Sequence, residues 1–256
     1  MFGGGGSRVT TAPPWVAPEL GIDGVAIRVT TRAGGVSLPP WDAQNLGDHV
    51  GDNPEHVAEN RRRLKDALRV NHINWLRQVH GTASVQAIND QVPTADAQWT
   101  TDPGRALAVL TADCLPVVFM TRDARCVGVA HAGWRGLAAG VLESLIASMP
   151  VTPATLTAWL GPSISQAAYE VGPGVKDAFR QVLGDCSEAC FVPSAVQEGH
   201  WMADLYALAR LHLRRAGVSE VQGGDRCTYG EADHFFSYRR DGDPTGRMAT
   251  LVWRAD

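Results

Sequence analysis

The chain has 256 residues, 45% of them hydrophobic and 20% charged, which is typical of a globular protein and excludes the disordered and fibrous classes. Its net charge of −4 leaves no broad basic surface, so we expect neither a nucleic acid nor a membrane as partner. No stretch approaches the roughly eighteen uninterrupted apolar residues of a membrane helix. Five scattered cysteines suit a reducing compartment better than a disulfide framework. We therefore expect a cytoplasmic protein with small-molecule chemistry.

The N-terminal part of the chain is predicted to begin with a flexible arm over residues 1–20, because glycines and prolines dominate it. A single domain is expected over residues 21–256. Alternating β-branched and polar residues predict a strand in residues 24–31. Residues 51–68 predict a helix that Asn53 caps, with the following proline in the first helical position.

The central part of the chain is rich in short apolar runs, which predict buried strands. A strand is also predicted over residues 73–81, where a period of two places Gln78 and His80 on one face. Apolar residues at helical spacing follow the apolar run at 126–131. The expected elements are strands at 106–114, 116–120, 126–131 and 155–160, helices at 137–149, 173–183 and 202–216, and a two-stranded hairpin in 235–253. Strands and helices without strict alternation predict an α+β fold.

Three residues at the ends of predicted strands, His80, Cys114 and His131, form a candidate metal site. Catalytic zinc typically has three protein ligands and one open position. Alternatively, Cys114 is a nucleophile with His131 as its base and Asp113 or another acid orienting that base. A third interpretation makes Cys114 a small buried hydrophobe. The residues alone leave these alternatives open.

The segment Gly133–Gly136, with Arg135 inside it, lies at a predicted junction between a strand and a helix. Free backbone N–H groups and the helix dipole favour an anion there, and an arginine adds a charged donor. Arg61, Arg239 and Arg240 are candidates to extend this anion site. The alternative is a sharp turn whose arginine pairs with a carboxylate. His49 has no partner at a telling spacing.

Seven segments occur in a fixed order from about residue 24 to the C-terminus: NLGDHVGDNPEHVAENRRRL, QVHGT, ADAQWT, TADCLPVVF, AHAGWRGLAAGV, GPSISQAAYEVG and FFSYRRDGDPTGRMATLVW. In this combination the sequence resembles the YfiH/YlmD laccase-domain family. The resemblance implies a single-domain α+β fold with a mixed β-sandwich core flanked by helices. It also implies that His80, Cys114 and His131 bind zinc, with copper as a possible occupant.

Two activities are implied by this resemblance. One is a copper-dependent polyphenol oxidase, and the other is a purine nucleoside phosphorylase that acts on adenosine, inosine, guanosine and methylthioadenosine and also deaminates adenosine. The eight histidines include no His-x-His pair, which argues against a multicopper cluster. A hydrolase with Cys114 as nucleophile and a non-catalytic binding subunit remain further alternatives.

The phosphorylase interpretation assigns a role to each remaining candidate residue. Asp113 handles protons, since deamination by zinc chemistry needs an acid or base. Phosphate must be held against C1′ of the ribose while charge develops there. The residues expected to bind phosphate are Arg61, Arg135 and Arg239, and those expected to bind the ribose or base are Asn45 and Gln78. The sequence thus predicts purine nucleosides and phosphate as ligands and leaves the oligomeric state open.

Overall fold

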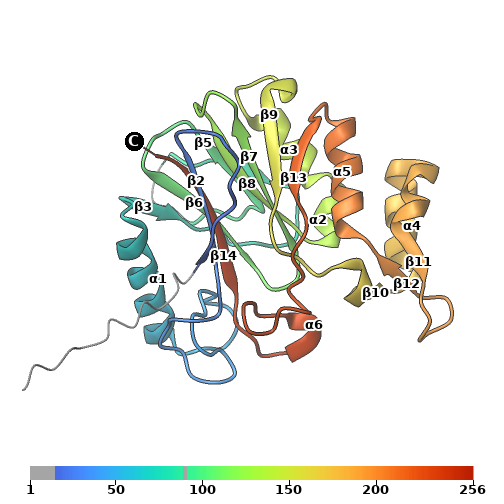
Figure 1. Ribbon diagram of the computed structural model, residues 1–256, viewed down its shortest axis with the longest axis horizontal. Coiled ribbons are helices and arrows are strands. Elements are labelled where there is room, and N and C mark those ends of the chain that lie inside the picture. Colours follow the sequence, from blue (N-terminus) through green and yellow to red (C-terminus); the bar gives the residue numbers. More distant parts are fainter. Residues whose placement is uncertain (1–14, 89–90, 256) are drawn as a thin grey trace, which may run out of the picture.

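Two mixed β-sheets form the centre of the computed structural model, which describes residues 15–88 and 91–255 (Figure 1). The five-stranded sheet has the order β1 (Trp15–Val16), β2 (Val25–Thr30), β14 (Met248–Arg254), β6 (Arg105–Thr111) and β3 (His72–Asn74). The six-stranded sheet has the order β13 (Glu220–Gly223), β9 (Leu156–Leu160), β7 (Leu115–Thr121), β8 (Val127–Ala132), β5 (Ala97–Thr100) and β4 (Ser84–Gln86). A small third sheet has the order β10 (Glu170–Val171), β12 (Trp201–Ala203) and β11 (Phe191–Pro193).

The two large sheets pack face to face, and helices cover their outer faces. Val29 and Val109 of one sheet share a buried cluster with Val118 and Val129 of the other. The outer face of the five-stranded sheet packs on α1 (Pro54–Leu68), and that of the six-stranded sheet on α2 (Trp134–Ala139), α3 (Val141–Ser148), α4 (Pro173–Leu183) and α5 (Leu205–Arg215). Shorter helices are α6 (Tyr238–Asp241), η1 (Pro153–Thr155), η2 (Gln166–Ala168) and η3 (Gly184–Cys190). The predicted α+β sandwich flanked by helices is confirmed.

Strands β7 and β8 form an antiparallel hairpin in which Pro116 lies opposite His131. All residues of both strands are buried, which explains their nearly continuous apolar sequence. Cys114 immediately precedes β7, and His131 lies near the end of β8. The hairpin therefore brings the cysteine and the histidine to the same end of the sheet.

Several predicted elements differ from the structure. The strand expected over 73–81 ends at Asn74, and His80 has a positive φ of 59° that is incompatible with a strand. The helix expected over 137–149 begins earlier and is interrupted by Gly140, whose φ is 95°. The hairpin expected in 235–253 is wrong, because α6 takes the place of its first strand and β14 pairs with β2 and β6 instead.

The predicted start of α1 is confirmed, since Asn53 accepts a hydrogen bond from the backbone N–H of Glu55. Most of the expected N-terminal arm, residues 1–14, lies outside the described residues. The prediction that the arm extends to residue 20 is wrong at Trp15 and Val16, because these two residues form strand β1 and pair with β2. Within residues 15–88 and 91–255, no helix is both long and apolar enough to cross a bilayer.

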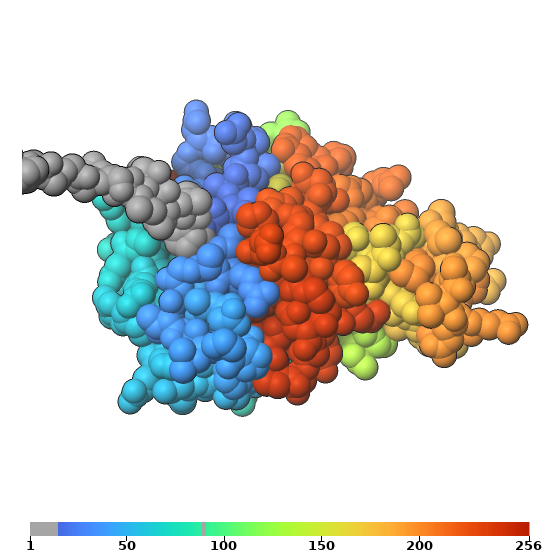
Figure 2. All heavy atoms as spheres, turned by 60° about the horizontal axis from the view of Figure 1, so that its bottom comes forward, coloured from blue at the N-terminus to red at the C-terminus, as the bar shows by residue number. Residues whose placement is uncertain are grey.

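Segments from the two ends of the chain lie side by side below the five-stranded sheet. Figure 2 shows residues coloured blue, from the loop after β2, in contact with red residues of the C-terminal segment. Backbone hydrogen bonds join them, from Arg32 N–H to His234 C=O and from Leu46 N–H to Arg247 C=O. This contact places the loop beside the segment that carries α6.

Candidate active site and metal centre

The three predicted metal ligands meet at one point. Nitrogen or sulfur atoms of His80, Cys114 and His131 all lie within 4.8 Å of one another. Cys114 Sγ is 3.9 Å from His80 Nε2, and the two imidazole rings are edge to face with centroids 4.7 Å apart. His131 is buried, Cys114 is partly exposed and His80 is exposed. The group is therefore open to solvent on one side.

Asp96, which sequence reasoning did not single out, organises two of these ligands. Its fully buried carboxylate accepts hydrogen bonds from the backbone N–H groups of Val79, His80 and Gly81, at 3.2, 2.9 and 2.7 Å. Its Oδ1 also lies 2.9 Å from His131 Nδ1, which leaves the other ring nitrogen for a metal. These hydrogen bonds stabilise the loop in the conformation that gives His80 its positive φ. The only sequence signal for Asp96 was its place in ADAQWT.

The electrostatics of the group favour a thiolate. Burial opposes ionisation of Cys114, but the charges and hydrogen bonds of His131 and His80 outweigh it and lower the pKa of the thiol to about 6. Burial likewise opposes protonation of His131, yet the Cys114 thiolate and Asp96 raise its pKa to about 9. A thiolate with two imidazoles is a donor set that suits zinc or copper.

Gly133 makes room for this arrangement. A Cβ at this position would lie 2.9 Å from Cys114 Sγ and 3.0 Å from a ring carbon of His80. Any larger residue would push the thiolate and the imidazole apart. Together with the donor set, this close packing indicates that the three side chains fit a single metal ion.

A cavity of about 430 Å³ adjoins the three ligands, a size that accommodates a small organic molecule. Its wall combines aromatic side chains with cationic ones. The aromatic residues are Trp134, Tyr169 and Tyr238, and the arginines are Arg135, Arg239 and Arg247. The wall therefore offers surfaces for a flat ring and donors for an anion.

Asp113 lines the cavity, but other groups already bind its carboxylate. Oδ1 accepts from Thr228 Oγ1 at 2.6 Å, and Oδ2 accepts from Ser237 Oγ at 3.0 Å and from the backbone N–H of Arg239 at 2.7 Å. The carboxylate that contacts His131 is that of Asp96. Asp113 thus anchors the start of α6, and of the two options given above for the acid that orients His131, Asp113 or another acid, the structure shows the second, Asp96.

Two of the predicted substrate-binding residues lie away from the cavity wall. Asn45 is fully buried, and its amide bonds Gly47, Asp52 and the backbone N–H of Arg247. Arg61 donates to the carbonyl of Leu46, pairs with Asp48 at 3.3 Å and stacks on Trp75. Both hold the loop after β2 against its neighbours, and neither is among the residues that line this cavity.

Gln78 lies on the cavity wall as expected, yet its amide is engaged in holding the chain. Its Nε2 donates to the carbonyl of Leu110 at 2.8 Å, and its Oε1 accepts from the N–H of Leu110 at 2.7 Å. This pair of bonds ties the loop that carries His80 to the end of β6. Gln78 therefore positions the metal-ligand loop.

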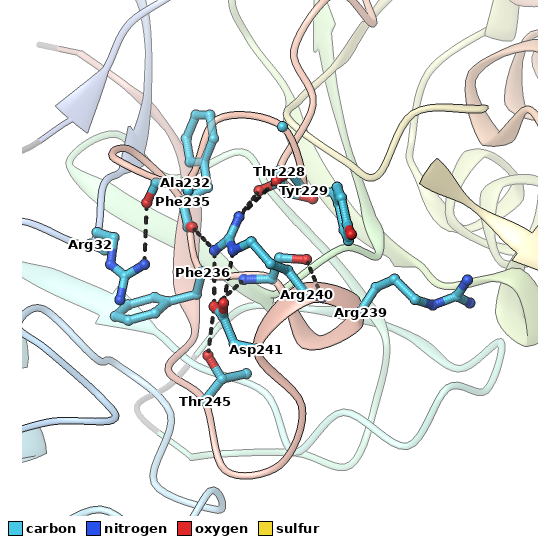
Figure 3. Close-up of polar contacts among 12 residues, drawn as sticks. Arg32, Thr228, Tyr229, Ala232, Phe235, Phe236, Arg239, Arg240, Asp241 and Thr245 are labelled. Carbon is cyan, nitrogen blue, oxygen red and sulfur yellow. Dashed lines mark hydrogen bonds and ion pairs between the residues drawn. The ribbon is translucent and has the colours of Figure 1, made fainter. Parts of the chain in front are cut away.

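The adjacent Arg239 and Arg240 point in different directions (Figure 3). Arg240 donates to the carbonyls of Thr228, Tyr229 and Phe235 and pairs with Asp241 at 2.7 Å, so it ties together the C-terminal segment. Arg239 extends the other way and lines the cavity. Of the two, only Arg239 lines the cavity.

His49 and Arg247 are among the cavity residues that sequence reasoning missed. His49 is exposed and lies 3.4 Å from a carboxylate oxygen of Asp48. It reaches the cavity because Asn60 of α1 hydrogen-bonds the carbonyls of Ala43 and Asn45 and thereby fixes the loop. No periodic spacing in the sequence indicates that these residues line the cavity, because both lie in loops and not on a helix or strand.

Comparisons with known proteins agree with this geometry. Residues 26–255 match the family described as multi-copper polyphenol oxidoreductase laccase. The chain is also 48% identical over 245 residues to the purine nucleoside phosphorylase YfiH of Escherichia coli, covering 94% of this chain and 97% of that protein. The chain belongs to the YfiH/YlmD family. The resemblance predicted from the seven sequence segments is confirmed.

Other members of the YfiH/YlmD family are similar to this chain along nearly their whole length. A purine nucleoside phosphorylase of Pseudomonas aeruginosa is 49% identical over 244 residues, covering 95% of this chain and 98% of that protein. The crystal structure of a Neisseria meningitidis protein superimposes with a TM-score of 0.90 at 46% identity, covering 95% and 100% of the two chains. That of YlmD from Geobacillus stearothermophilus gives 0.89 at 32% identity, covering 96% and 98%.

Proposed function

We propose that this protein is a zinc-dependent purine nucleoside phosphorylase that also deaminates adenosine. The observation that carries the proposal is the group of His80, Cys114 and His131 opening onto a cavity walled by aromatic and arginine side chains. The phosphorylase names of the relatives in Escherichia coli and Pseudomonas aeruginosa support it. The proposed substrates are adenosine, inosine, guanosine and methylthioadenosine.

His80, Cys114 and His131 would hold the zinc ion. When bound, zinc supplies a Lewis acid at the edge of the cavity. Copper is the alternative metal, and the family description together with the donor set favours a copper-dependent phenol oxidase as a second candidate. Among the residues that the structure describes, this is the only group of three or more such donors, which argues against a multicopper cluster.

The remaining wall residues suit a nucleoside and phosphate. The rings of Trp134, Tyr169 and Tyr238 offer flat apolar surface for a purine. Arg135 and Arg239 line the cavity, where they would hold an anion and stabilise the charges that change during the reaction. In phosphorolysis a phosphate oxygen bonds to C1′ of the ribose, and the bond from C1′ to the purine nitrogen breaks with its electron pair on the purine.

The departing purine needs a proton, which hydrogen phosphate ultimately supplies as it forms the sugar ester. Three donors already occupy the carboxylate of Asp113, so it is poorly placed to relay this proton. His49 lies on the same cavity wall and is exposed. Imidazole is the side chain used most often for proton transfer near neutral pH. We therefore assign the proton transfer of phosphorolysis to His49.

A product analysis tests the proposed function. The purified protein, with its metal content measured, is incubated with inosine and phosphate and with adenosine in the presence and absence of phosphate. Formation of hypoxanthine and adenine only with phosphate, and of inosine from adenosine, is the expected result. Chelation should abolish both reactions, and zinc should restore them.

The alternatives give different outcomes in the same assay. Oxidation of a phenolic dye after copper loading, without nucleoside cleavage, would favour the oxidase. A covalent adduct on Cys114 in metal-free, active protein would favour the cysteine hydrolase. Absence of turnover on every nucleoside despite bound zinc would leave a binding protein and refute the proposal.

A further inference from the structure

Arg247 is an arginine without a counter-ion in the wall of the cavity. It is partly buried, and this burial lowers the pKa of its guanidinium. Its Nη1 donates to the carbonyls of Thr245 and Gly246 at 2.9 and 3.0 Å. Within residues 15–88 and 91–255, no carboxylate lies within ion-pair distance of it, and its Nε and Nη2 donors have no hydrogen-bond partner. Desolvating a charge without a partner is costly, which points to an anionic ligand.

The protein holds this side chain in place. The backbone N–H of Arg247 donates to Asn45 Oδ1 at 2.9 Å, within the network that fixes the loop after β2. Gly47 of that loop packs so closely on Arg247 that a Cβ would lie 2.8 Å from its Cγ. With these contacts and the two carbonyls bound to Nη1, the guanidinium is pre-organised, so little side-chain entropy is lost when a ligand binds.

Two further arginines of the same wall also lack counter-ions among the residues described. Arg135 stacks on Trp134, with its guanidinium carbon 4.4 Å from the ring centroid. Arg239 donates one hydrogen bond to the carbonyl of Glu170. The single carboxylate of the wall, Asp113, is already bound by three donors. The cavity therefore presents three cationic groups, which outnumber the two anionic groups of its wall, the Cys114 thiolate and the already bound carboxylate of Asp113.

We propose that Arg247 is the principal recognition residue of an oxyanion subsite that binds a dianionic phosphoryl group, assisted by Arg135 and Arg239. Arg247 dominates because it is partly buried and fixed, whereas the other two are exposed and screened by solvent. The inference rests on the proposed function in taking the phosphoryl group to be a substrate. Its source is inorganic phosphate or the phosphate ester of a nucleotide.

The test compares the zinc-loaded wild type with Arg247→Met, Arg247→Lys and the surface control Arg62→Gln. Calorimetry measures binding of inorganic phosphate and, separately, of inosine monophosphate and of inosine. Phosphorolysis assays give KM for phosphate and for inosine. We expect Arg247→Met to weaken phosphate binding and to raise KM for phosphate about tenfold or more, with KM for inosine changed less than about twofold. Arg247→Lys should recover part of the affinity, and the control should match the wild type.

Each outcome bears on one of the two proposals. Equal phosphate affinity in the wild type and both Arg247 variants would overturn the inference. If Arg247→Met does not fold, a weaker phosphate affinity of folded Arg247→Lys supports it and an unchanged one overturns it. Arg247-dependent binding of inosine monophosphate but not of free phosphate identifies a nucleotide as the source. Arg247-dependent phosphate binding without nucleoside cleavage in the wild type would refute the proposed function and leave the subsite standing.

Discussion

Replacing Asp96 by asparagine tests the view that this carboxylate organises the metal site. Asparagine has one acceptor oxygen, whereas Asp96 accepts four hydrogen bonds through two oxygens. In one amide orientation the N–H groups of Val79 and Gly81 lose their acceptor, and in the other those of His80 and His131 do. Two hydrogen bonds to a buried charged group are lost either way, at about 1.5 to 3 kcal/mol each before relaxation.

The expected effects of Asp96→Asn are a Tm lower by about 6 °C or more, for a loss of about 3 kcal/mol, and a zinc affinity lower by about 10- to 100-fold. Calorimetry of the metal-free protein gives the first value, and competition with a chromophoric chelator gives the second. Asp66→Asn, at a side chain that is 62% exposed on α1, is the matched control. Unchanged stability together with unchanged zinc affinity in Asp96→Asn would refute the reasoning.

Three further substitutions address other parts of the structure. Gly133→Ala should lower zinc affinity about tenfold or more with little change in the stability of the metal-free protein, because its Cβ would lie 2.9 Å from Cys114 Sγ. His49→Gln should lower kcat for phosphorolysis about 100-fold with zinc content unchanged, as expected for loss of a proton donor. Glu143→Gln should destabilise the protein at pH 7 by about 1 kcal/mol, because its carboxylate bonds the buried His212 at 2.6 Å.

The pH dependence of the last variant has a definite sign. Burial opposes ionisation of Glu143, but the hydrogen bond and charge of His212 outweigh it and lower the pKa of Glu143. The ionised Glu143 therefore stabilises the folded protein at pH values above the ordinary carboxyl pKa. This stabilisation is lost as the pH falls through the lower pKa that Glu143 has in the folded state. The difference in Tm between the wild type and Glu143→Gln should shrink below about pH 4. A difference that grows on acidification would contradict this assignment.

Matched controls accompany the other two variants. Gly174→Ala introduces a methyl group at a position with no atom within 4 Å, so zinc affinity should not change. His234→Gln removes an exposed imidazole outside the cavity wall and should leave kcat unchanged. Equal zinc affinity of Gly133→Ala and the wild type would show that the ligands tolerate the methyl group. A normal kcat of His49→Gln would exclude His49 as the proton donor.

The sequence predicted the parts of the site that lie on regular strands. The apolar runs of β7 and β8 predicted two buried strands, and the register of their pairing places Cys114 beside His131. His80 was predicted with less physical basis, because its strand ends at Asn74 and the loop that carries it depends on Asp96. A carboxylate that binds backbone N–H groups far away in the sequence leaves no periodic signal. The resemblance of the whole motif set was the stronger reason to place His80 beside Cys114 and His131.

The cationic wall was harder to predict, because it depends on which arginines already have partners. Arg61 resembles an anion-binding residue in the sequence, but Asp48 neutralises it. Arg240 resembles its neighbour Arg239, yet backbone carbonyls and Asp241 bind it. Composition cannot distinguish a paired arginine from an unpaired one, since pairing is a property of tertiary contacts.

Asp113 and Cys114 show how one peptide unit connects the two halves of the site. The positive φ of Asp113, 90°, lets the carboxylate reach the start of α6 while the next side chain joins the metal ligands. Since the carboxylate binds the backbone N–H of Arg239, the position of that arginine is fixed relative to Cys114. The candidate metal ligands and Arg239, one of the three arginines of the proposed oxyanion subsite, therefore share one support.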